Sequence, residues 1–296
     1  MKRIDPAELS GFLAIATHRS FRRAAVELGV TPSALSHALR ALEERLGVRL
    51  VNRTTRSVAL TEAGEQLYTG IRPAFRDIDA ALENLNAFRG QPMGTLRLNA
   101  ARQSAQLALM PLVYRFLRAH PDVQVEVRVD EGLTDIVSAG FDAGVRFGEL
   151  IAADMVAVPL GPRQRSAVVA SPAYFARHAR PRTPQELRGL PCIRYRFHSG
   201  VLYRWEFERD GEEVEVEVEG PLTLSDQELM VEATLEGLGL AYLFEARVEA
   251  LLVRGQLVRV LEDWCPSYPG FFLYYPSRRQ LPAALRAFVD FAKAPA

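Results

Sequence analysis

The chain has 296 residues, of which 48% are hydrophobic and 24% are charged, which predicts two or three folded domains with substantial cores. No segment reaches the roughly 20 consecutive apolar residues of a membrane span, and the first twenty residues are periodic, so we expect neither a membrane helix nor a signal peptide. The net charge of zero hides an asymmetry, because residues 1–61 carry ten Lys/Arg and five Asp/Glu. This favours a polyanionic partner for the N-terminal part, although an uneven surface explains the charge equally well.

Three short helices are predicted in the first 46 residues. Apolar residues recur at helical spacing in the first of them, at Leu9, Phe12, Leu13 and Ala16. Ser20 is a typical N-cap for a second helix that ends near Gly29. Thr31 caps the third helix, and Pro32 takes its first position, where a missing N–H costs nothing. The short connection between the second and third helices is that of a helix-turn-helix.

The third helix has one apolar face and one face of short polar side chains. The buried stripe is predicted from Leu35, Leu39, Leu42 and Leu46. The outward face carries Pro32, Ser33, Ser36, His37 and Arg40. Short side chains let a helix approach base edges and phosphates in the major groove, and Arg40 and His37 can reach guanine acceptors. A surface helix that carries small residues by chance is the alternative.

The segment after Gly47, "VRLVNRTTRSVALT", alternates partly and predicts a two-stranded wing. We expect Arg53 and Arg56 in this wing to lie over the phosphate backbone or in a minor groove. The capped turn, the basic charge and the wing together favour DNA binding over a chance surface.

A long helix is predicted from the cap at Thr61 to about Phe88. Its apolar positions are spaced like a heptad seam: Ile71, Phe75, Ile78, Leu82 and Leu85. We expect this seam to mediate dimerisation, and packing onto its own domain is the alternative. Pro73 should kink or interrupt the helix. Residues 89–94, "RGQPMG", predict a hinge.

From Thr95 strands and helices alternate, which predicts a mostly parallel sheet with covering helices. A second such block begins near Arg163, and it contains a hairpin whose Asp210-Gly211 turn suits type I′ geometry. Two α/β subdomains of similar size imply a ligand cleft between them, at the carboxyl ends of strands.

The stretch from Ala24 to Gly64, "AAVELGVTPSALSHALRALEERLGVRLVNRTTRSVALTEAG", resembles the winged helix-turn-helix of LysR-type transcriptional regulators. The motifs "AGVRFGE", "VVASPAY", "WEFERDGE" and "YPSRR" resemble one large branch of that family. The resemblance implies an all-α winged helix-turn-helix with a long linker helix, then an α/β domain similar to type-2 periplasmic binding proteins. It also implies a homodimer or homotetramer that binds and bends promoter DNA. A small-molecule effector then changes the arrangement and the contact with RNA polymerase.

The resemblance and the residue patterns together predict the domain division. We expect a DNA-binding domain at 1–61, a linker helix for dimerisation at 62–89, a hinge at 90–94 and an effector-binding domain at 95–296. Subdomain I is expected at about 95–161 and 268–296, and subdomain II at about 162–267.

The resemblance also assigns roles to individual residues. DNA contacts fall on Thr31, Pro32, Ser33, Ser36, His37, Arg40 and Arg53. The effector cleft would begin at Arg102, Gln103 and Ser104, whose free N–H groups and hydroxyl suit a carboxylate or similar anion. Further cleft residues are expected at Glu131, Thr134, Arg146, Phe147, His198, Ser225 and Asp226. As alternatives, Arg146 pairs with a neighbouring acid and Asp226 only caps its helix.

An enzyme, a solute receptor and an architectural DNA binder are the alternatives to a regulator. No GxSxG, HExxH or paired CxxC pattern occurs, which argues against an enzyme, and we expect no metal and no cofactor. Cys192 and Cys265 form no ligand pattern and suggest the cytoplasm. A solute receptor would suit the C-terminal two-thirds but not the basic N-terminal domain. An architectural DNA binder without an effector stays open.

Overall fold

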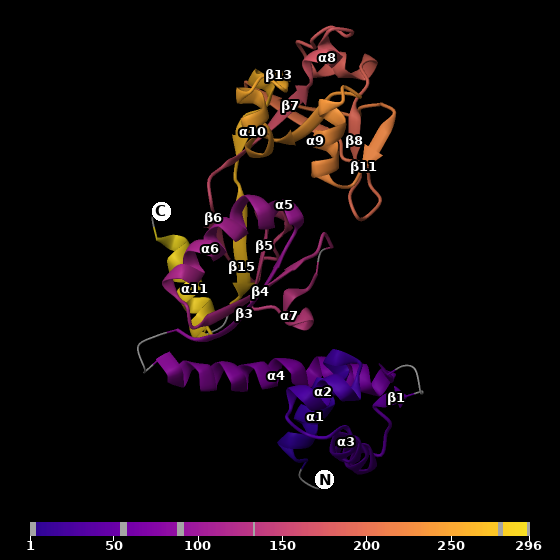
Figure 1. Ribbon diagram of the computed structural model, residues 1–296, viewed down its shortest axis with the longest axis vertical. Helices are drawn as coiled ribbons and strands as arrows, with labels where there is room; N and C mark the ends of the chain where they lie inside the picture. Colours follow the sequence, from indigo (N-terminus) through magenta and orange to yellow (C-terminus); the bar gives the residue numbers. More distant parts are fainter. Residues whose placement is uncertain (1–3, 54–57, 88–91, 133, 278–280, 295–296) are drawn as a thin grey trace.

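The computed structural model describes residues 4–53, 58–87, 92–132, 134–277 and 281–294, and within α4 the side chains of residues 76, 79, 80 and 82–87 lie outside the described set. The described chain forms a winged helix, a long helix and a two-part α/β domain (Figure 1). In this described part, no helix is both long enough and apolar enough to cross a membrane.

The N-terminal domain contains the three predicted helices and the wing. Its elements are α1 (Pro6–His18), α2 (Phe21–Glu27), α3 (Pro32–Leu46), β1 (Val51–Arg53) and β2 (Val58–Leu60). The predicted caps are confirmed, because Ser20 Oγ accepts from the Arg23 N–H and Thr31 Oγ1 accepts from the Ala34 N–H. Gly29 has φ +65°, the left-handed conformation that ends α2. Phe12, Ile15 and Leu42 are fully buried at the centre of this domain.

Helix α4 (Glu62–Ala87) begins at the predicted cap, since Thr61 Oγ1 accepts from the Gly64 N–H at 3.0 Å. A side chain at Gly64 would place its Cβ 2.0 Å from the carbonyl oxygen of Leu50, so the helix and the wing approach too closely for any other residue. Pro73 does not interrupt α4, which runs through this proline as one helix, and the kink that was the other predicted outcome stays a prediction.

Subdomain I is a five-stranded sheet in the order β4-β3-β5-β15-β6. The strands are β3 (Gly94–Ala100), β4 (Val123–Val129), β5 (Ala143–Phe147), β6 (Met155–Leu160) and β15 (Phe271–Pro276). Strand β3 pairs in parallel with β4 and β5, whereas β15 runs antiparallel to β5 and β6. The sheet is mixed because the chain leaves subdomain I after β6 and returns from subdomain II through β15.

Helices cover one face of this sheet, and they include one irregular stretch. The helical run consists of α5 (Arg102–Ser104), a π-helical stretch η1 (Ala105–Leu109) and α6 (Met110–Ala119), and α11 (Ala283–Lys293) packs beside it. The Met110 N–H bonds the Ala105 carbonyl, one residue wider than in an α-helix. Pro111 follows directly and has no N–H to donate, which favours such a local irregularity. The opposite face carries a smaller cluster that contains Ile136 of α7 (Ile136–Ala139) and Tyr274.

Subdomain II is built around β7 (Gln164–Ala170), which is apolar on both faces. Val168 packs into one core cluster and Val169 into another. Strands β12 (Ala241–Phe244), β13 (Val258–Val260) and β14 (Ser267–Tyr268) all pair antiparallel with β7, so the mostly parallel sheet that we predicted is wrong here. The remaining strands are β8 (Ile193–Tyr195), β9 (Trp205–Arg209), β10 (Glu212–Val216) and β11 (Leu222–Leu224).

Three α-helices belong to subdomain II: α8 (Pro172–Phe175), α9 (Gln227–Leu235) and α10 (Glu245–Val253). Short 3-10 turns occur at Gly148–Leu150, Pro184–Gly189 and Glu262–Trp264. The β9–β10 hairpin turns at Asp210 and Gly211 with φ values of 53° and 82°, which confirms the predicted type I′ turn. The sequence did not indicate β6, β13, β14 or α10, and α10 contributes to the site described below.

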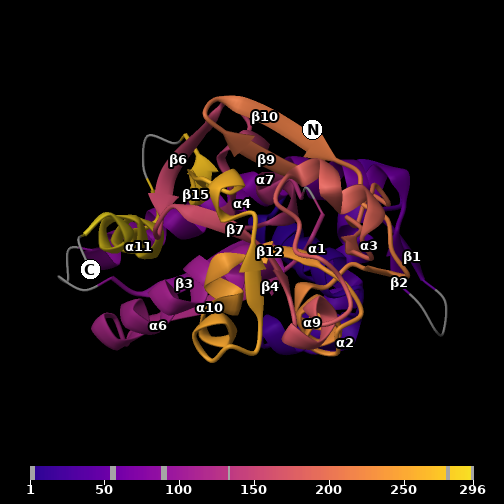
Figure 2. The same ribbon diagram turned by 90° about the horizontal axis from the view of Figure 1, so that it is seen from above.

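Helix α4 contacts subdomain I as well as the winged helix. Figure 1 shows α4 between the winged helix and subdomain I, and both α7 and α11 contact it. Arg72 donates to the carbonyls of Ser138 and Ala139, at 2.7 and 2.8 Å, where α7 ends. The same juxtaposition is seen from above in Figure 2, where α7 overlies α4. The DNA-binding and effector-binding domains therefore meet through this helix.

Candidate DNA interface and effector cleft

The outward face of α3 is exposed as predicted. Thr31, Pro32, Ser33, His37 and Arg40 are exposed, and Ser36 is half-buried. The opposite face is fixed in the core by Leu35, Leu39 and Leu42. The wing is anchored to α3 by Glu43, whose Oε1 accepts from the N–H groups of Leu50 and Val51 at 2.8 and 3.2 Å.

Arg53 joins the wing to both helices of the helix-turn-helix. Its Nη1 donates to Ser36 Oγ at 2.8 Å, and its guanidinium lies 5.8 Å from the ring centroid of Phe21 at the start of α2. The start of α2, the middle of α3 and the first wing strand therefore converge on one surface. Arg56, the second predicted wing contact, lies outside the described residues.

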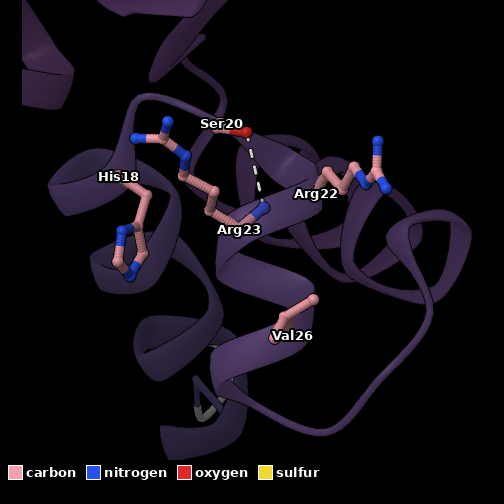
Figure 3. A pocket seen from close by; sticks show the side chains of 5 residues that line it. All are labelled: His18, Ser20, Arg22, Arg23 and Val26. Carbon is pink, nitrogen blue, oxygen red and sulfur yellow. Dashed lines mark hydrogen bonds between the residues drawn. The ribbon is translucent and has the colours of Figure 1, made fainter.

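A pocket of about 410 Å³ lies between the end of α1 and α2 (Figure 3). Its lining residues are His18, Ser20, Arg22, Arg23 and Val26. Arg22 and Arg23 are exposed, and in Figure 3 their guanidinium groups extend in different directions from the first turn of α2. The sequence reading did not single out these two arginines, although two adjacent cations after an N-cap are a recognisable pattern in a basic domain.

The predicted dimerisation residues of α4 divide into different environments. Ile71 is half-buried and packs against the core of its own winged helix, which is the environment weighed as the alternative, and its role in a dimer seam stays a prediction. Phe75 is half-buried, and Ile78 is 55% exposed. The side chains of Leu82 and Leu85 lie outside the described set.

Two contacts at the start of α5 lie where the effector cleft is predicted, and one of them joins the two subdomains. The guanidinium of Arg102 lies 3.4 Å from the carboxylate of Asp226, which belongs to subdomain II. The Arg102 N–H donates to Glu131 Oε1 at 2.8 Å. The expectation of a free N–H at Arg102 is therefore wrong, because a carboxylate of the chain itself accepts it.

Ser104 does not offer its hydroxyl to the cleft as we predicted. The hydroxyl donates to the carbonyls of Ala101 and Val145, at 2.9 and 3.2 Å, and the residue is 1% exposed. A buried hydroxyl with two backbone acceptors stabilises the start of α5 instead of binding a ligand. Gln103 faces subdomain II, where its Oε1 accepts from Arg247 at 2.7 Å.

Asp226 caps its helix and also pairs with Arg102 of subdomain I. Its Oδ1 accepts from the N–H groups of Glu228 and Leu229, which caps α9, while its Oδ2 faces Arg102. Tyr195 lies close to Asp226 and Glu131, and burial together with these two carboxylates raises the pKa of its phenol. The phenol is therefore neutral at physiological pH and can donate one hydrogen bond.

Phe147 lies where the two subdomains join. Its ring centroid is 4.6 Å from that of Phe271 and 6.0 Å from that of Phe244 on β12. Arg146, the preceding residue, is buried and bonds carbonyl oxygens rather than the neighbouring acid that we weighed as an alternative. Phe147 thus forms an aromatic contact between the two subdomains, with Phe244.

The remaining residues predicted for the cleft, Thr134, His198 and Ser225, do not join the group around Arg102. Thr134 Oγ1 donates to the Asp130 carboxylate at 3.1 Å, which is a contact within its own loop. His198 is exposed in the 197–200 turn, and Ser225 is exposed just before α9. The structure therefore brings together Arg102, Gln103, Glu131 and Asp226 from the predicted set.

The sequence profile of the LysR substrate binding domain matches residues 89–295, and that of the bacterial regulatory helix-turn-helix proteins of the lysR family matches residues 7–65. The chain belongs to the LysR family of transcriptional regulators. A relative in Escherichia coli (strain K12), the uncharacterized HTH-type transcriptional regulator YcaN, is 45% identical over 98% of this chain and 95% of its own length. Like its relatives, this LysR-type regulator binds DNA and carries an effector-binding domain.

Two solved structures share the full-length fold of this LysR-type regulator. CrgA, a LysR-type transcriptional regulator from Neisseria meningitidis, is 30% identical, covers 98% of both chains and superposes with a TM-score of 0.60. The Vibrio cholerae virulence activator AphB, a member of the same family, is 24% identical over 97% of this chain and 98% of its own, with a TM-score of 0.63. The likeness to AphB shows the fold alone.

The contacts between the two subdomains of this LysR-type regulator include residues that the sequence did not indicate. Arg247 of α10 donates to Gln103 and Gln106 of subdomain I and lies 3.4 Å from Glu228 of α9. Gln106 Nε2 also donates to Glu228 at 2.6 Å. Arg247 follows the carboxyl end of β12 by three residues, and the ends of strands are where α/β domains place ligand-binding side chains. The position of Arg247 just after β12 would have indicated this residue if α10 had been predicted from the sequence.

Proposed function

We propose that this regulator binds promoter DNA as a homodimer, with the N-terminal half of α3 in the major groove and the wing on the phosphate backbone. The exposed face of α3 supports this proposal more than any other observation. Its outward side chains are short up to Ser36, so the helix can approach base edges closely, and His37 and Arg40 follow with longer reach. Arg53 then contacts a phosphate beside the groove, and Arg56 is proposed for the same role.

Arg22 and Arg23 extend this surface to the start of α2. The first helix of a helix-turn-helix crosses the DNA backbone, where cations neutralise phosphates without reading sequence. Phe21 lies against Arg53, which places these arginines beside the wing contact. We therefore assign them to phosphate binding.

The proposed dimer uses the exposed part of α4. Ile78 is an apolar side chain with more than half of its surface exposed on a helix whose earlier residues pack on their own domain. A partner α4 would cover Ile78 together with Phe75, and Leu82 and Leu85 continue the spacing. Two dimers would form the tetramer that the family resemblance implies.

The proposed effector site lies between Arg102, Gln103, Glu131 and Asp226. Because Glu131 already accepts the Arg102 N–H, an anion alone has to displace a carboxylate of the chain. A polar effector with both donor and acceptor groups fits better, since its donors face Glu131 and Asp226 and its acceptor faces Arg102. RNA polymerase is the further partner that we propose, because an effector changes transcription only through the polymerase or its access to the promoter.

Footprinting of genomic fragments that the protein selects tests the proposed dimer. A two-fold symmetric dimer predicts an inverted repeat whose half-sites are separated by one helical turn, about 10 base pairs, or a multiple of it. Protected sites that contain a single half-site would contradict the homodimer.

A thermal-shift screen of metabolites tests the effector site. A ligand at about 100 times its dissociation constant stabilises the folded protein by about 2.7 kcal/mol, which is readily detected. The Asp226→Asn variant should lose the shift caused by any effector that has a cationic donor. An absence of any stabilising metabolite would favour the architectural DNA binder.

A further inference from the structure

Arg146 is a buried cation without a matching carboxylate. It lies on β5, is 4% exposed, and donates through Nη2 to Asn99 Oδ1, to the Asp130 carbonyl and to the Gly132 carbonyl, at 3.0, 2.9 and 2.7 Å. Among the described residues, Arg146 forms no ion pair. A buried charge requires a counter-charge or a complete set of hydrogen bonds to be stable.

Two acids of the loops beside this arginine accept hydrogen bonds within their own turns. The Asp130 carboxylate accepts from the Gly132 N–H at 3.0 Å and from Thr134 Oγ1 at 3.1 Å, and these contacts, followed by the nearby charges of Arg128 and Arg146, lower its pKa. The Asp135 carboxylate caps α7 by accepting from Val137 and Ser138. Both carboxylates are therefore turned toward backbone N–H groups and do not neutralise the guanidinium at contact distance.

Two buried donors point to what completes the site. Arg146 Nη1 and Asn99 Nδ2 are both buried and have no hydrogen-bond partner among the residues that the structure describes, and Asn99 is 0% exposed. The two residues are joined through Arg146 Nη2 and Asn99 Oδ1, which fixes their remaining N–H groups in the same part of the subdomain. Leaving such donors unsatisfied costs free energy, more so beside a full charge.

The Tyr274 ring covers this part of the sheet, over Gly144. Asn99, Gly144 and Tyr274 lie side by side on β3, β5 and β15. A Cβ at position 144 would lie 2.5 Å from the Tyr274 ring, so the glycine admits this phenol next to the arginine. The surroundings thus supply N–H and O–H groups at one end of the sheet, below the loop that carries Glu131.

We propose that Asn99 and Arg146 bind a small monovalent anion through Nδ2 and Nη1. The ligand is a halide or a single carboxylate group, because these accept from N–H groups and carry a negative charge that the guanidinium lacks at contact distance. The bound anion completes the hydrogen bonds of Arg146, which also holds the carbonyls of Asp130 and Gly132 on either side of Glu131. The site would therefore stabilise the loop that lines the effector cleft, whatever the effector is.

Bromide is the probe that tests this site. Crystals of the full-length protein grown in sodium bromide should show anomalous bromine density within hydrogen-bond distance of both nitrogens. Density without an anomalous signal would mean a water molecule there and would overturn the proposal.

A thermal titration tests the same site in solution. At constant ionic strength, kept with sodium methanesulfonate, bromide should raise the Tm of the full chain by about 2–4 °C in a saturable manner. Asn99→Asp places a carboxylate beside Arg146 and should abolish this response. The control Thr234→Val removes another fully buried polar group, in subdomain II, and should keep it. Equal responses in the wild type and N99D would contradict the anion site.

Formate separates the two sources of the anion. If formate competes with bromide for the anomalous position, the site accepts carboxylates such as that of a metabolite. If bromide stays at equal formate concentration, the site is specific for halide ions. Either result keeps the anion site, and the absence of both ions from the position would overturn it.

Discussion

Arg53 of the wing and Ser36 of the recognition helix are hydrogen-bonded to each other at 2.8 Å, so two of the proposed DNA contacts are held together in the free protein. Arg53→Ala should weaken binding to every duplex and should lower the slope of log K against log salt by about one unit, because one phosphate contact is lost. Fluorescence anisotropy between 50 and 200 mM salt measures this slope. Arg118→Ala, an exposed arginine on α6, is the matched control and should leave it unchanged. A normal slope for R53A would reject the phosphate contact.

Base preference should depend on Ser36 and His37. Replacing either by Ala removes a group that we propose to face the base edges and should change discrimination at one or two positions by about 1–3 kcal/mol each. Binding selection from a randomised operator measures this change. An equal loss of affinity for all sequences would instead assign the residue to the backbone.

The local elements of this chain were predictable because their causes are local. Ser20, Thr31 and Thr61 each cap a helix within three residues, and Asp210-Gly211 makes its own turn. The outward face of α3 followed from the spacing of its leucines. The alternation of strands and helices in the two α/β subdomains was predictable because the spacing of apolar residues is also a local property.

The cleft was harder to predict because its partners are distant in the sequence. Arg102 bonds Glu131 across 29 positions, and Arg247 bonds Gln103 across 144. Nothing near Ser104 indicates that the Val145 carbonyl takes its hydroxyl. Ile71 fits a heptad as well as it fits its own core, so spacing alone did not decide between these two environments.

Ile78 should carry the α4 contact between subunits. Ile78→Glu places a charge on an exposed apolar position and should shift sedimentation from dimer to monomer without lowering the Tm of the winged helix. Thr69→Glu, an exposed position of the same helix, should leave the dimer intact. Ile71→Glu should destabilise the winged helix itself. Persistent I78E dimers would place the interface elsewhere.

Arg72 should couple the linker helix to subdomain I. Arg72→Ala removes the two bonds to the Ser138 and Ala139 carbonyls and should increase hydrogen exchange in α7 about tenfold. Arg72→Lys retains a cation near the end of α7 and should show a smaller increase. Exchange rates that match the wild type in both variants would show that α4 and α7 are not coupled in solution.

Arg247 should hold the two subdomains together across the cleft. Arg247→Ala removes its bonds to Gln103 and Gln106, so the distance between the subdomains should increase and its distribution should broaden. Double electron–electron resonance between spin labels at exposed positions of α6 and of the β9–β10 hairpin measures this distance. Arg254→Ala, at the exposed end of α10, is the control. An unchanged distribution in R247A would mean that the aromatic contacts of Phe147 suffice.

The central claim is that the winged helix recognises particular DNA sequences. Competition binding of the purified full-length protein, between genomic fragments selected by it and random duplex of equal length at about 150 mM salt, tests this directly. A sequence-specific regulator predicts a preference of about 1,000-fold or more for the selected fragments. Equal affinity for both, with and without cell extract as a source of effector, would contradict the claim.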